Sequence, residues 1–420
     1  MKSFKKTVLL SFVLIFSINV SAAVFYLVGY PAESPNIESL RSALFYPGNE
    51  SFSFAQKQFF MKNNFYDLGL VYSVNIHKGH PDLKYKIWIQ ARPAPIIVIL
   101  PGIGSFYDNA KVIALAELFY LKGYSVLTIS DVFNWEFCES ASSVLTPGYS
   151  PVDSADIYYA LCKIFKQLEK KYRDRITDKI LVGFSLGALH TLFIADIESK
   201  LKNSISFSRY LALNPPVNLL YAAKKLDEYY SVGYSMTNKQ ITESISEGLS
   251  LYQKVLDKQL DPSTPIDLED NEAKYIIGLN FHTSLIELIY SINSHNKLPV
   301  IRQKSSWFSR EALYKEIDKF DFCDYLLLIL RPYYSKEIGK RLSLENINKA
   351  SSLPAINETL RTNKKIRMIH TANDFLLTNI QKKWLEHIMG ERLTILDHGG
   401  HCGYLYFDQA SDIICKNIKL

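Results

Sequence analysis

The first feature with chemical meaning is a serine between two glycines, in Gly183-Phe-Ser-Leu-Gly187. These residues follow a short apolar run and open a helical pattern. In a sharp turn from strand to helix the central side chain is strained and exposed, and glycine is needed two places away because a Cβ would collide across the turn. We therefore predict Ser185 as a nucleophile, with the backbone N–H of Leu186 facing a developing oxyanion. The alternative is an ordinary turn that packs Ser185 internally.

A second glycine-rich turn, Leu100-Pro-Gly-Ile-Gly-Ser105, follows the strongest strand-like run in the chain. Its glycines let backbone amides approach a substrate closely. We predict the N–H of Ile103 as the second oxyanion donor, with Gly102 close by. A plain tight turn is the competing interpretation.

Two histidines near the end of the chain compete for the role of general base, which a weakly nucleophilic serine needs. Both lie in Asp397-His-Gly-Gly-His401, a loop whose glycines can carry an imidazole over the edge of a sheet. We predict His401, because it lies deeper in the loop than His398, which adjoins the strand end. His190, one turn into the helix after the serine, is a poor candidate.

An aspartate placed after the penultimate strand-like run is suited to orient that histidine. Asp374 ends the segment Thr371-Ala-Asn-Asp, and a carboxylate there would fix the imidazole tautomer and stabilise its cation. The other local acid, Asp397, is expected to end the final strand, so we rank Asp374 above it. The order Ser, Asp, His along the chain is the hydrolase order, and it differs from the chymotrypsin and subtilisin orders.

The elements that must position these residues alternate between strand and helix. Strand-like runs lie at 66–74, 85–89, 95–100, 125–129, 180–182, 210–213, 366–370 and 393–396, with helical patterns between most of them. Such alternation predicts an α/β fold class with a mostly parallel sheet, and the run at 95–100 suits its buried middle. Residues 218–358 show amphipathic helical stretches without strand rhythm, which predicts a helical insertion into one domain.

Together these motifs resemble the α/β-hydrolase family. The resemblance is carried by Leu-Pro-Gly-Ile-Gly-Ser, Gly-Phe-Ser-Leu-Gly, Ala-Asn-Asp and Gly-Gly-His-Cys-Gly, each at the expected strand end. It implies a core at 64–217 and 359–420, preceded by an N-terminal segment at 23–63, and a helical lid at 218–358 after the sixth strand. One departure is Pro101, where many members have His before the glycine. The long insertion is reminiscent of the lid-bearing YheT-like hydrolases.

The resemblance also implies a site and a reaction. Ser185, Asp374 and His401 would form the triad, and Ile103 and Leu186 would supply the oxyanion amides. The reaction would be two-step acyl transfer on a carboxylic ester, with a lipidic ester as one candidate, and without a diffusible cofactor or a metal. An acyltransferase or a serine peptidase on the same triad, and a non-catalytic binding protein on a hydrolase core, are the alternatives.

The N-terminal residues 1–22 have the pattern of a secretory signal peptide. Three lysines lie among the first six residues, an uncharged and mostly apolar run covers 7–20, and small residues at 20–22 fit a cut after Ala22 or Ala23. We therefore expect an exported protein, periplasmic or secreted. The alternative is a membrane anchor, because the uncharged stretch continues to Gly29. In that case the leader, or the lid, would contact a membrane.

The amino-acid composition bears on which partners, disulfides and metal sites the chain could have. An apolar fraction of 48% supports a large core, and 48 Lys+Arg against 42 Asp+Glu, without a basic run, predicts no nucleic-acid partner. The hydrolase resemblance implies a small-molecule or lipid ester as the binding partner. The five cysteines are odd in number, widely spaced and without a CxxC, so neither a disulfide framework nor a zinc site is indicated, although one isolated pair stays open. The pairs His77/His80 and His398/His401 lack partnering ligands, so we predict loop histidines there.

Overall fold

The computed structural model describes residues 22–45, 64–202, 204–257, 259–303 and 310–419. Except for Ala22, the predicted signal peptide lies outside these residues, so its cleavage stays a prediction. Among the helices in the described ranges, none is both long and apolar enough to cross a membrane.

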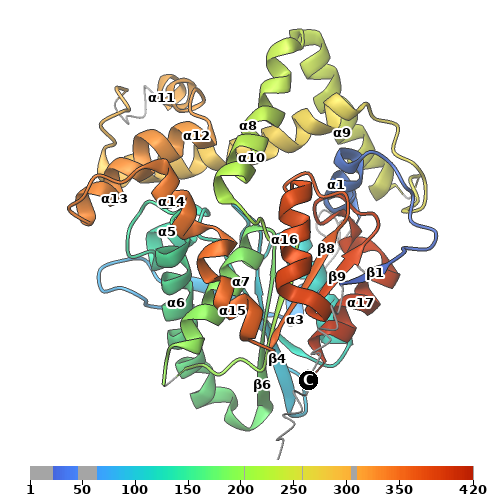
Figure 1. Ribbon diagram of the computed structural model, residues 1–420, viewed down its shortest axis with the longest axis vertical. Helices are drawn as coiled ribbons and strands as arrows, with labels where there is room; N and C mark the ends of the chain where they lie inside the picture. Colours follow the sequence, from blue (N-terminus) through green and yellow to red (C-terminus); the bar gives the residue numbers. More distant parts are fainter. Residues whose placement is uncertain (1–21, 46–63, 203, 258, 304–309, 420) are drawn as a thin grey trace, which may run out of the picture.

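A nine-stranded sheet forms the centre of the described part of the chain (Figure 1). Its spatial order is β1-β9-β8-β7-β6-β4-β5-β3-β2, and every neighbouring pair is parallel except β2–β3 and β3–β5. The predicted α/β class with a mostly parallel sheet is thereby confirmed. The strands are β1 (Ala23–Phe25), β2 (Leu70–Val74), β3 (Leu83–Trp88), β4 (Ala94–Leu100), β5 (Ser125–Ile129), β6 (Ile176–Phe184), β7 (Arg209–Leu213), β8 (Ile366–Thr371) and β9 (Leu393–Leu396).

Strand β4 shows why the sheet lies at the centre, because both of its faces are covered. Ile96, Val98 and Leu100 point into one apolar cluster, whereas Ile97 and Ile99 point into another. This alternation follows from the two-residue period of a strand, and an apolar side chain at every position is what a doubly covered strand requires. The first cluster includes residues of α5 (Trp135–Ala141), α6 (Ser150–Tyr172), α7 (Leu186–Ser199) and α16 (Asn379–Met389), and the second those of α4 (Ala110–Leu121) and α17 (Asp408–Ile418).

Between β7 and β8 the described chain is helical and contains no strand. Figure 1 shows α8 to α13 gathered at one end of the molecule, while α14 and α15 return along the core. Two of the predicted amphipathic stretches, 219–230 and 284–292, lie in α8 and α10, which pack against each other. The insertion comprises α8 (Leu219–Ser231), α9 (Asn238–Leu256), α10 (Asp270–Asn296), α11 (Arg310–Ile317), α12 (Phe322–Asp324), a π-helical turn (Tyr325–Leu330), α13 (Arg331–Glu337), α14 (Leu344–Ser351) and α15 (Asn357–Thr362).

The N-terminal segment forms two elements that the sequence patterns did not identify. Strand β1 extends the sheet beside β9, and helix α1 (Pro35–Leu44) packs on the turn after β9 and on α10. Ser34 caps α1, because its hydroxyl accepts the N–H of Ile37. A further difference concerns the expected strand at 66–74, whose first residues belong to the short helix α3 (Asn64–Leu68), since Trp88 donates its indole N–H to the Phe65 carbonyl.

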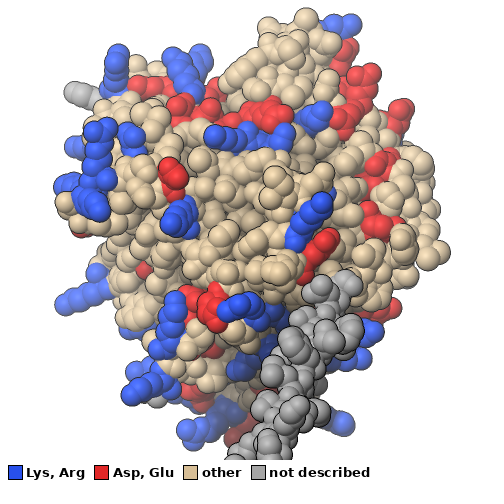
Figure 2. Space-filling model, viewed as in Figure 1, with Lys and Arg blue, Asp and Glu red and all other residues tan. Residues whose placement is uncertain are grey.

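Charged side chains are mixed in sign on the face of the molecule that Figure 2 shows. Lys and Arg lie mostly toward the rim, interspersed with Asp and Glu, around a largely uncharged middle. A surface of this kind differs from the continuous basic stripe that a nucleic acid needs. The absence of a nucleic-acid partner nevertheless stays a prediction.

Candidate active site

Ser185 occupies the turn between β6 and α7. Its backbone adopts φ 55° and ψ −122°, a combination that is strained for a residue with a side chain. The N–H of Ser185 donates to the Leu213 carbonyl at 2.9 Å, which fastens the turn to β7. The turn therefore holds the serine at the carboxyl edge of the sheet, as the motif predicts.

The two glycines of the motif are required by close contacts. A Cβ on Gly183 would lie 2.2 Å from the carbonyl oxygen of Gly187, and one on Gly187 would lie 2.1 Å from that of Leu100. Neither backbone oxygen can move without opening the junction of β4, β6 and α7. The glycines thus allow α7 to start directly against the end of the sheet.

His401 lies between Ser185 and Asp374. Its Nε2 is 2.8 Å from Ser185 Oγ, and its Nδ1 is 2.9 Å from Asp374 Oδ2. The aspartate follows β8 and the histidine follows β9, so both come from loops at the same sheet edge as the serine. A serine, an imidazole and a carboxylate at these distances have the geometry of a hydroxyl with its base and the orienting acid of that base.

Asp374 is buried, and its surroundings favour the charged carboxylate. Its Oδ2 also accepts the Asn214 side-chain N–H at 2.7 Å, and its Oδ1 accepts the N–H of Leu376 at 2.8 Å. Burial by itself raises the pKa of this carboxyl, but the positive charge and hydrogen bond of His401, together with the hydrogen bond from Asn214, outweigh it and bring the pKa to about 2. The base is therefore paired with an anion at neutral pH.

His370 also lies near this carboxylate, with its Nδ1 3.6 Å from Asp374 Oδ2. Burial lowers the pKa of His370, so the ring is neutral. Its Nδ1 accepts the N–H of Thr371 at 3.1 Å, and its Nε2 lies 3.3 Å from the Pro215 carbonyl. The arrangement defines a neutral tautomer that leaves the carboxylate charge to His401.

The three residues ranked lower as triad members have other partners. His398 Nδ1 lies 2.9 Å from Glu38 Oε1, and Asp397 Oδ1 accepts the N–H of Leu27 at 2.9 Å. His190 is buried on α7, and burial lowers its pKa to about 3. None of the three contacts Ser185 in the described structure.

The proposed oxyanion amides lie on either side of the serine. Leu186 is the first residue of α7, and Ile103 lies in the loop after β4, beside Gly102. A Cβ on Gly102 would be 3.3 Å from the Cβ of Ser185, so this loop approaches the serine closely. The loop is held by Asp131, whose Oδ1 accepts the N–H of Gly104 at 3.0 Å, and burial raises the pKa of this carboxyl to about 7.

The order of the strands in the sheet, together with the loops that carry the three residues, identifies the fold. Counted from β2, the described strands follow chain order except that β4 and β5 exchange places and β1 lies at the far edge beside β9. The serine, the aspartate and the histidine follow β6, β8 and β9. This combination of a sheet order with a nucleophile turn, an acid loop and a base loop matches what the motifs predict. The chain has the α/β-hydrolase fold.

The comparisons with known proteins concern this fold alone. Among the solved structures similar to this chain is a Legionella pneumophila protein described provisionally as a hydrolase (11% identity, 89% of this chain and 96% of that chain, TM-score 0.48). Also similar is an esterase from Pyrococcus furiosus (13% identity, 85% of this chain and 93% of that chain, TM-score 0.42). Est1E from Butyrivibrio proteoclasticus is a third similar structure (12% identity, 82% of this chain and 96% of that chain, TM-score 0.38). No protein-family model and no curated protein matches the chain.

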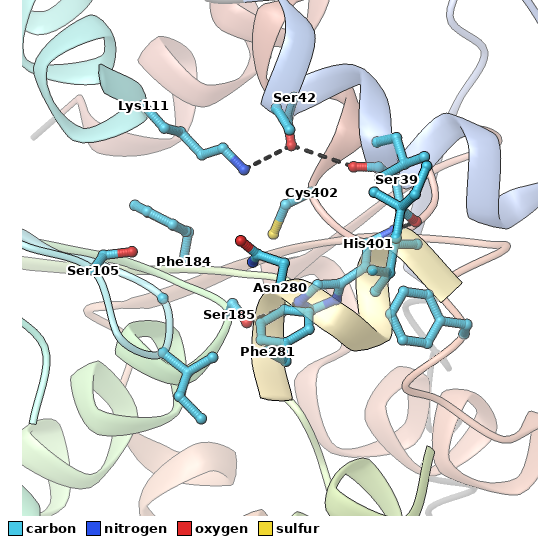
Figure 3. A pocket seen from close by; sticks show the side chains of 17 residues that line it. Ser39, Ser42, Ser105, Lys111, Phe184, Ser185, Asn280, Phe281, His401 and Cys402 are labelled. Atoms are coloured by element: carbon cyan, nitrogen blue, oxygen red, sulfur yellow. Dashed lines mark hydrogen bonds between the residues drawn. The ribbon is translucent and has the colours of Figure 1, made fainter. Parts of the chain in front are cut away.

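Two cavities meet at Ser185, and the helical insertion of this α/β-hydrolase fold forms part of both. The larger, of about 230 Å³, is lined by α1 and α10 together with Ser185 and His401 (Figure 3). The smaller, of about 60 Å³, lies between α8 and the segment at 322–326 and is lined almost entirely by apolar side chains. Ile103 and Phe281 border both cavities. The serine is thus accessible from two sides of different chemistry.

Helix α1 supplies supporting residues that the sequence patterns did not reveal. Glu38 is fully buried, and its carboxylate accepts the Asn373 side-chain N–H at 2.7 Å and the N–H of Gly399 at 2.6 Å, besides contacting His398. Ser39 Oγ accepts the N–H of His401 at 2.7 Å. The helix therefore joins the acid loop to the base loop. Only the Ser-Pro start of a capped helix at 34–35 could have indicated it.

Other groups of metal-binding residue types have structural partners. His77 and His80 each contact a backbone carbonyl of α5, at 3.1 and 3.0 Å. Asp227, Asp321 and Cys323 lie together, but the Asp227 carboxylate accepts the N–H groups that open α12. This is the chemistry of a helix cap. All five cysteines are free thiols, so the isolated disulfide left open above does not form in the structure.

Proposed function

We propose that this protein is a serine hydrolase that cleaves a carboxylic ester through Ser185, His401 and Asp374. The observation that carries the proposal is the pair of contacts of His401, 2.8 Å to Ser185 Oγ and 2.9 Å to Asp374 Oδ2. The strained turn at the serine supports it, because such strain persists only where the surroundings maintain it.

The chemistry would run in two steps. His401 Nε2 accepts the hydroxyl proton while Ser185 Oγ attacks the ester carbonyl, and the N–H groups of Ile103 and Leu186 stabilise the oxyanion. Collapse of the tetrahedral intermediate breaks the bond to the alcohol, which leaves with the proton from His401. Water then attacks the acyl-serine, again with His401 as base, and releases the acid.

The two cavities guide the choice of substrate. An ester bond at Ser185 would place one part of the substrate in the apolar cavity beside α8, which suits an acyl chain, and the other part in the larger cavity. We therefore propose a small-molecule or lipidic ester, with the insertion acting as its lid. A panel of p-nitrophenyl esters of rising chain length would measure the acyl preference.

An activity-based probe tests the proposal directly. A fluorophosphonate should label the wild-type protein and fail to label Ser185→Ala, whereas Ser105→Ala, in the same cavity and off the triad, should still be labelled. A folded wild-type protein that resists labelling would contradict the hydrolase proposal and favour a non-catalytic binding role. Assays with added alcohol or amine acceptors separate hydrolysis from acyl transfer, and peptide substrates test the peptidase alternative.

Export is a separate proposal, supported by the sequence pattern of residues 1–22. Expression of the full chain with its leader should yield a periplasmic or secreted protein whose N-terminus begins after Ala22 or Ala23. N-terminal sequencing of the purified product measures this. An intact leader in a membrane fraction would instead support an anchor.

A further inference from the structure

A lysine lies in the cavity of the candidate nucleophile. Lys111, the second residue of α4, donates from Nζ to Ser42 Oγ of α1 at 2.9 Å. Lys111 and Ser42 line the same cavity of about 230 Å³ as Ser185 and His401. Figure 3 shows the lysine side chain reaching toward Ser42, with the serine and the histidine across the cavity.

No carboxylate balances this ammonium group in the described ranges. The ion pairs of those residues leave Lys111 out, whereas Lys122 at the other end of α4 pairs with Asp412 at 3.4 Å. Burial lowers the pKa of the Lys111 ammonium. The nearby Cys402 thiol is not a counter-ion, because burial raises its pKa to about 12 and keeps it protonated at neutral pH. Lys111 is half-buried, and a cation that has lost part of its water without gaining a counter-ion favours a ligand that supplies one.

The rest of the described cavity wall supplies no counter-ion for Lys111 either. Among its described lining residues there is no Asp or Glu, and Lys111 is the only Lys or Arg. Besides Ser185, His401 and the Cys402 thiol, the polar side chains of the wall are the neutral ones of Ser39, Ser42, Ser105 and Asn280. An ammonium group carries three N–H donors, of which Ser42 takes one, so two donors are left for a bound group.

The second cavity at Ser185 differs from the first in the charge of its lining side chains. It is bordered by Leu219, Ala222 and Leu226 of α8 and by Phe322 and Leu326, and no charged side chain lines its described part. A substrate held across the serine would therefore meet a cation on one side of its ester bond and an apolar surface on the other.

We propose that Lys111 selects esters that carry an anionic group, a carboxylate or a phosphate, on the side of the ester bond that faces α1. This inference rests on the proposed hydrolase function and adds the substrate class to it. Lys111 is then a specificity-determining residue, which binds the substrate without entering the bond-making steps. Serine hydroxyls and the Asn280 amide around it would complete the hydrogen bonds of the anion.

A competing role for Lys111 is structural, because its bond to Ser42 joins α4 to α1. Substitution would then disturb the cavity for every substrate alike. The two roles differ in one measurable quantity, the ratio of kcat/KM for an anionic ester to that for its neutral counterpart.

The test compares matched ester pairs in the full-length protein. In 3-acetoxybenzoate and phenyl acetate the charge is on the leaving group, and in mono-p-nitrophenyl glutarate and p-nitrophenyl butyrate it is on the acyl group. A 3-acetoxyphenyl phosphate arm separates phosphate from carboxylate. The wild type should prefer the anionic member of one pair, and Lys111→Met should lower that preference about tenfold to hundredfold, as the loss of a hydrogen bond to a charged group does.

Two controls make the outcome decisive. Lys122→Met removes a cation from the same helix outside the cavity and should keep the wild-type preference. Equal losses for anionic and neutral esters in Lys111→Met, with Ser185 still labelled by a fluorophosphonate, would overturn this inference and leave the hydrolase proposal standing. A wild-type protein that neither labels nor hydrolyses any ester would overturn the hydrolase proposal itself.

Discussion

Two of the buried aspartate–histidine pairs in the described structure, Asp374 with His401 and Asp153 with His190, are built in opposite ways. Asp374 accepts three hydrogen bonds besides lying near His370, and its pKa falls to about 2. Asp153 accepts one, from the N–H of Gly148 at 2.8 Å, and burial raises its pKa well above the usual range. Burial raises the pKa of both carboxyls, so the charge and hydrogen bond of His401, with the further donors at Asp374, account for the difference in charge.

The histidines of the two pairs differ in the same way. His401 has a partner at each ring nitrogen, whereas neither nitrogen of His190 has one in the described structure, and its Nε2 lies 4.0 Å from Asp153. Proximity of an acid and an imidazole therefore does not by itself make a catalytic pair. A base needs a charged partner on one side and a substrate-facing group on the other.

The largest expected difference between the pairs is in turnover. Asp374→Asn should lower kcat about 10⁴-fold, because the amide favours the wrong imidazole tautomer. Asp153→Asn, the matched change in the other pair, should leave kcat within about threefold of the wild type. The measurement is kcat on the best p-nitrophenyl ester, and equal losses in both variants would remove the distinction.

The second difference concerns stability against acid. In the unfolded chain His190 takes up a proton as the pH falls below about 6.5, whereas the folded pKa is about 3, so protonation favours unfolding between these values. Replacing His190 with Leu should therefore reduce the stability lost between pH 7 and pH 4 by about 3 kcal/mol. Burial lowers the pKa of His370 as well, so part of the loss should persist in the variant.

Denaturant unfolding at several pH values measures this effect. His387→Leu is the control, because it removes an imidazole that is exposed on α16. An unchanged pH slope in His190→Leu would show that the buried ring is not the source of the acid sensitivity.

A smaller effect is expected from Asn214, a hydrogen-bond donor to the candidate catalytic carboxylate of Asp374. Asn214 is buried, has φ 49° and donates to Asp374 Oδ2. Asn214→Ala should lower kcat about tenfold to hundredfold, as loss of a residue that orients a catalytic group does. KM should change little, because Asn214 does not border the cavity, and a rise in KM alone would argue against this positioning role.

The smallest effect is expected in the stability of the second pair. A carboxyl with a raised folded pKa loses stability as the pH rises above its unfolded value, so Asp153 destabilises the fold at pH 7. Asp153→Asn should stabilise the protein by about 1 kcal/mol at pH 7, since the amide oxygen can still accept from Gly148. The gain should vanish near pH 4, and thermal unfolding at both pH values measures it.

Much of the site could be predicted because its members are marked locally. The glycines around Ser185 and the loops after two apolar strands are short-range signals, and the strand rhythm assigns them to one sheet edge. Choosing His401 over His398 also used only the position in the loop, and the structure brings His401 to the serine. Catalytic roles, export and the extent of the lid stay predictions.

The supporting residues could not be predicted, because their partners are distant in sequence. Glu38, Asn214 and Lys111 look like surface polar residues until the fold brings them against other segments. The helix at 64–68 was missed for a related reason, since a tertiary contact with Trp88 overrides the strand-like pattern. Sequence patterns identify residues whose role is marked by the loop in which they lie. They do not identify residues whose role depends on a contact with a distant segment.

The attachment of α1 to the base loop has a consequence for how activity arises during folding. Each contact that holds this loop joins two residues far apart in the sequence, with separations of 360, 361 and 362 positions. Pairing over such separations forms late, after the entropy of closing a long chain loop has been overcome. We expect refolding protein to regain its secondary structure well before the proposed hydrolase activity, because the base loop is held in place only once α1 has packed against it.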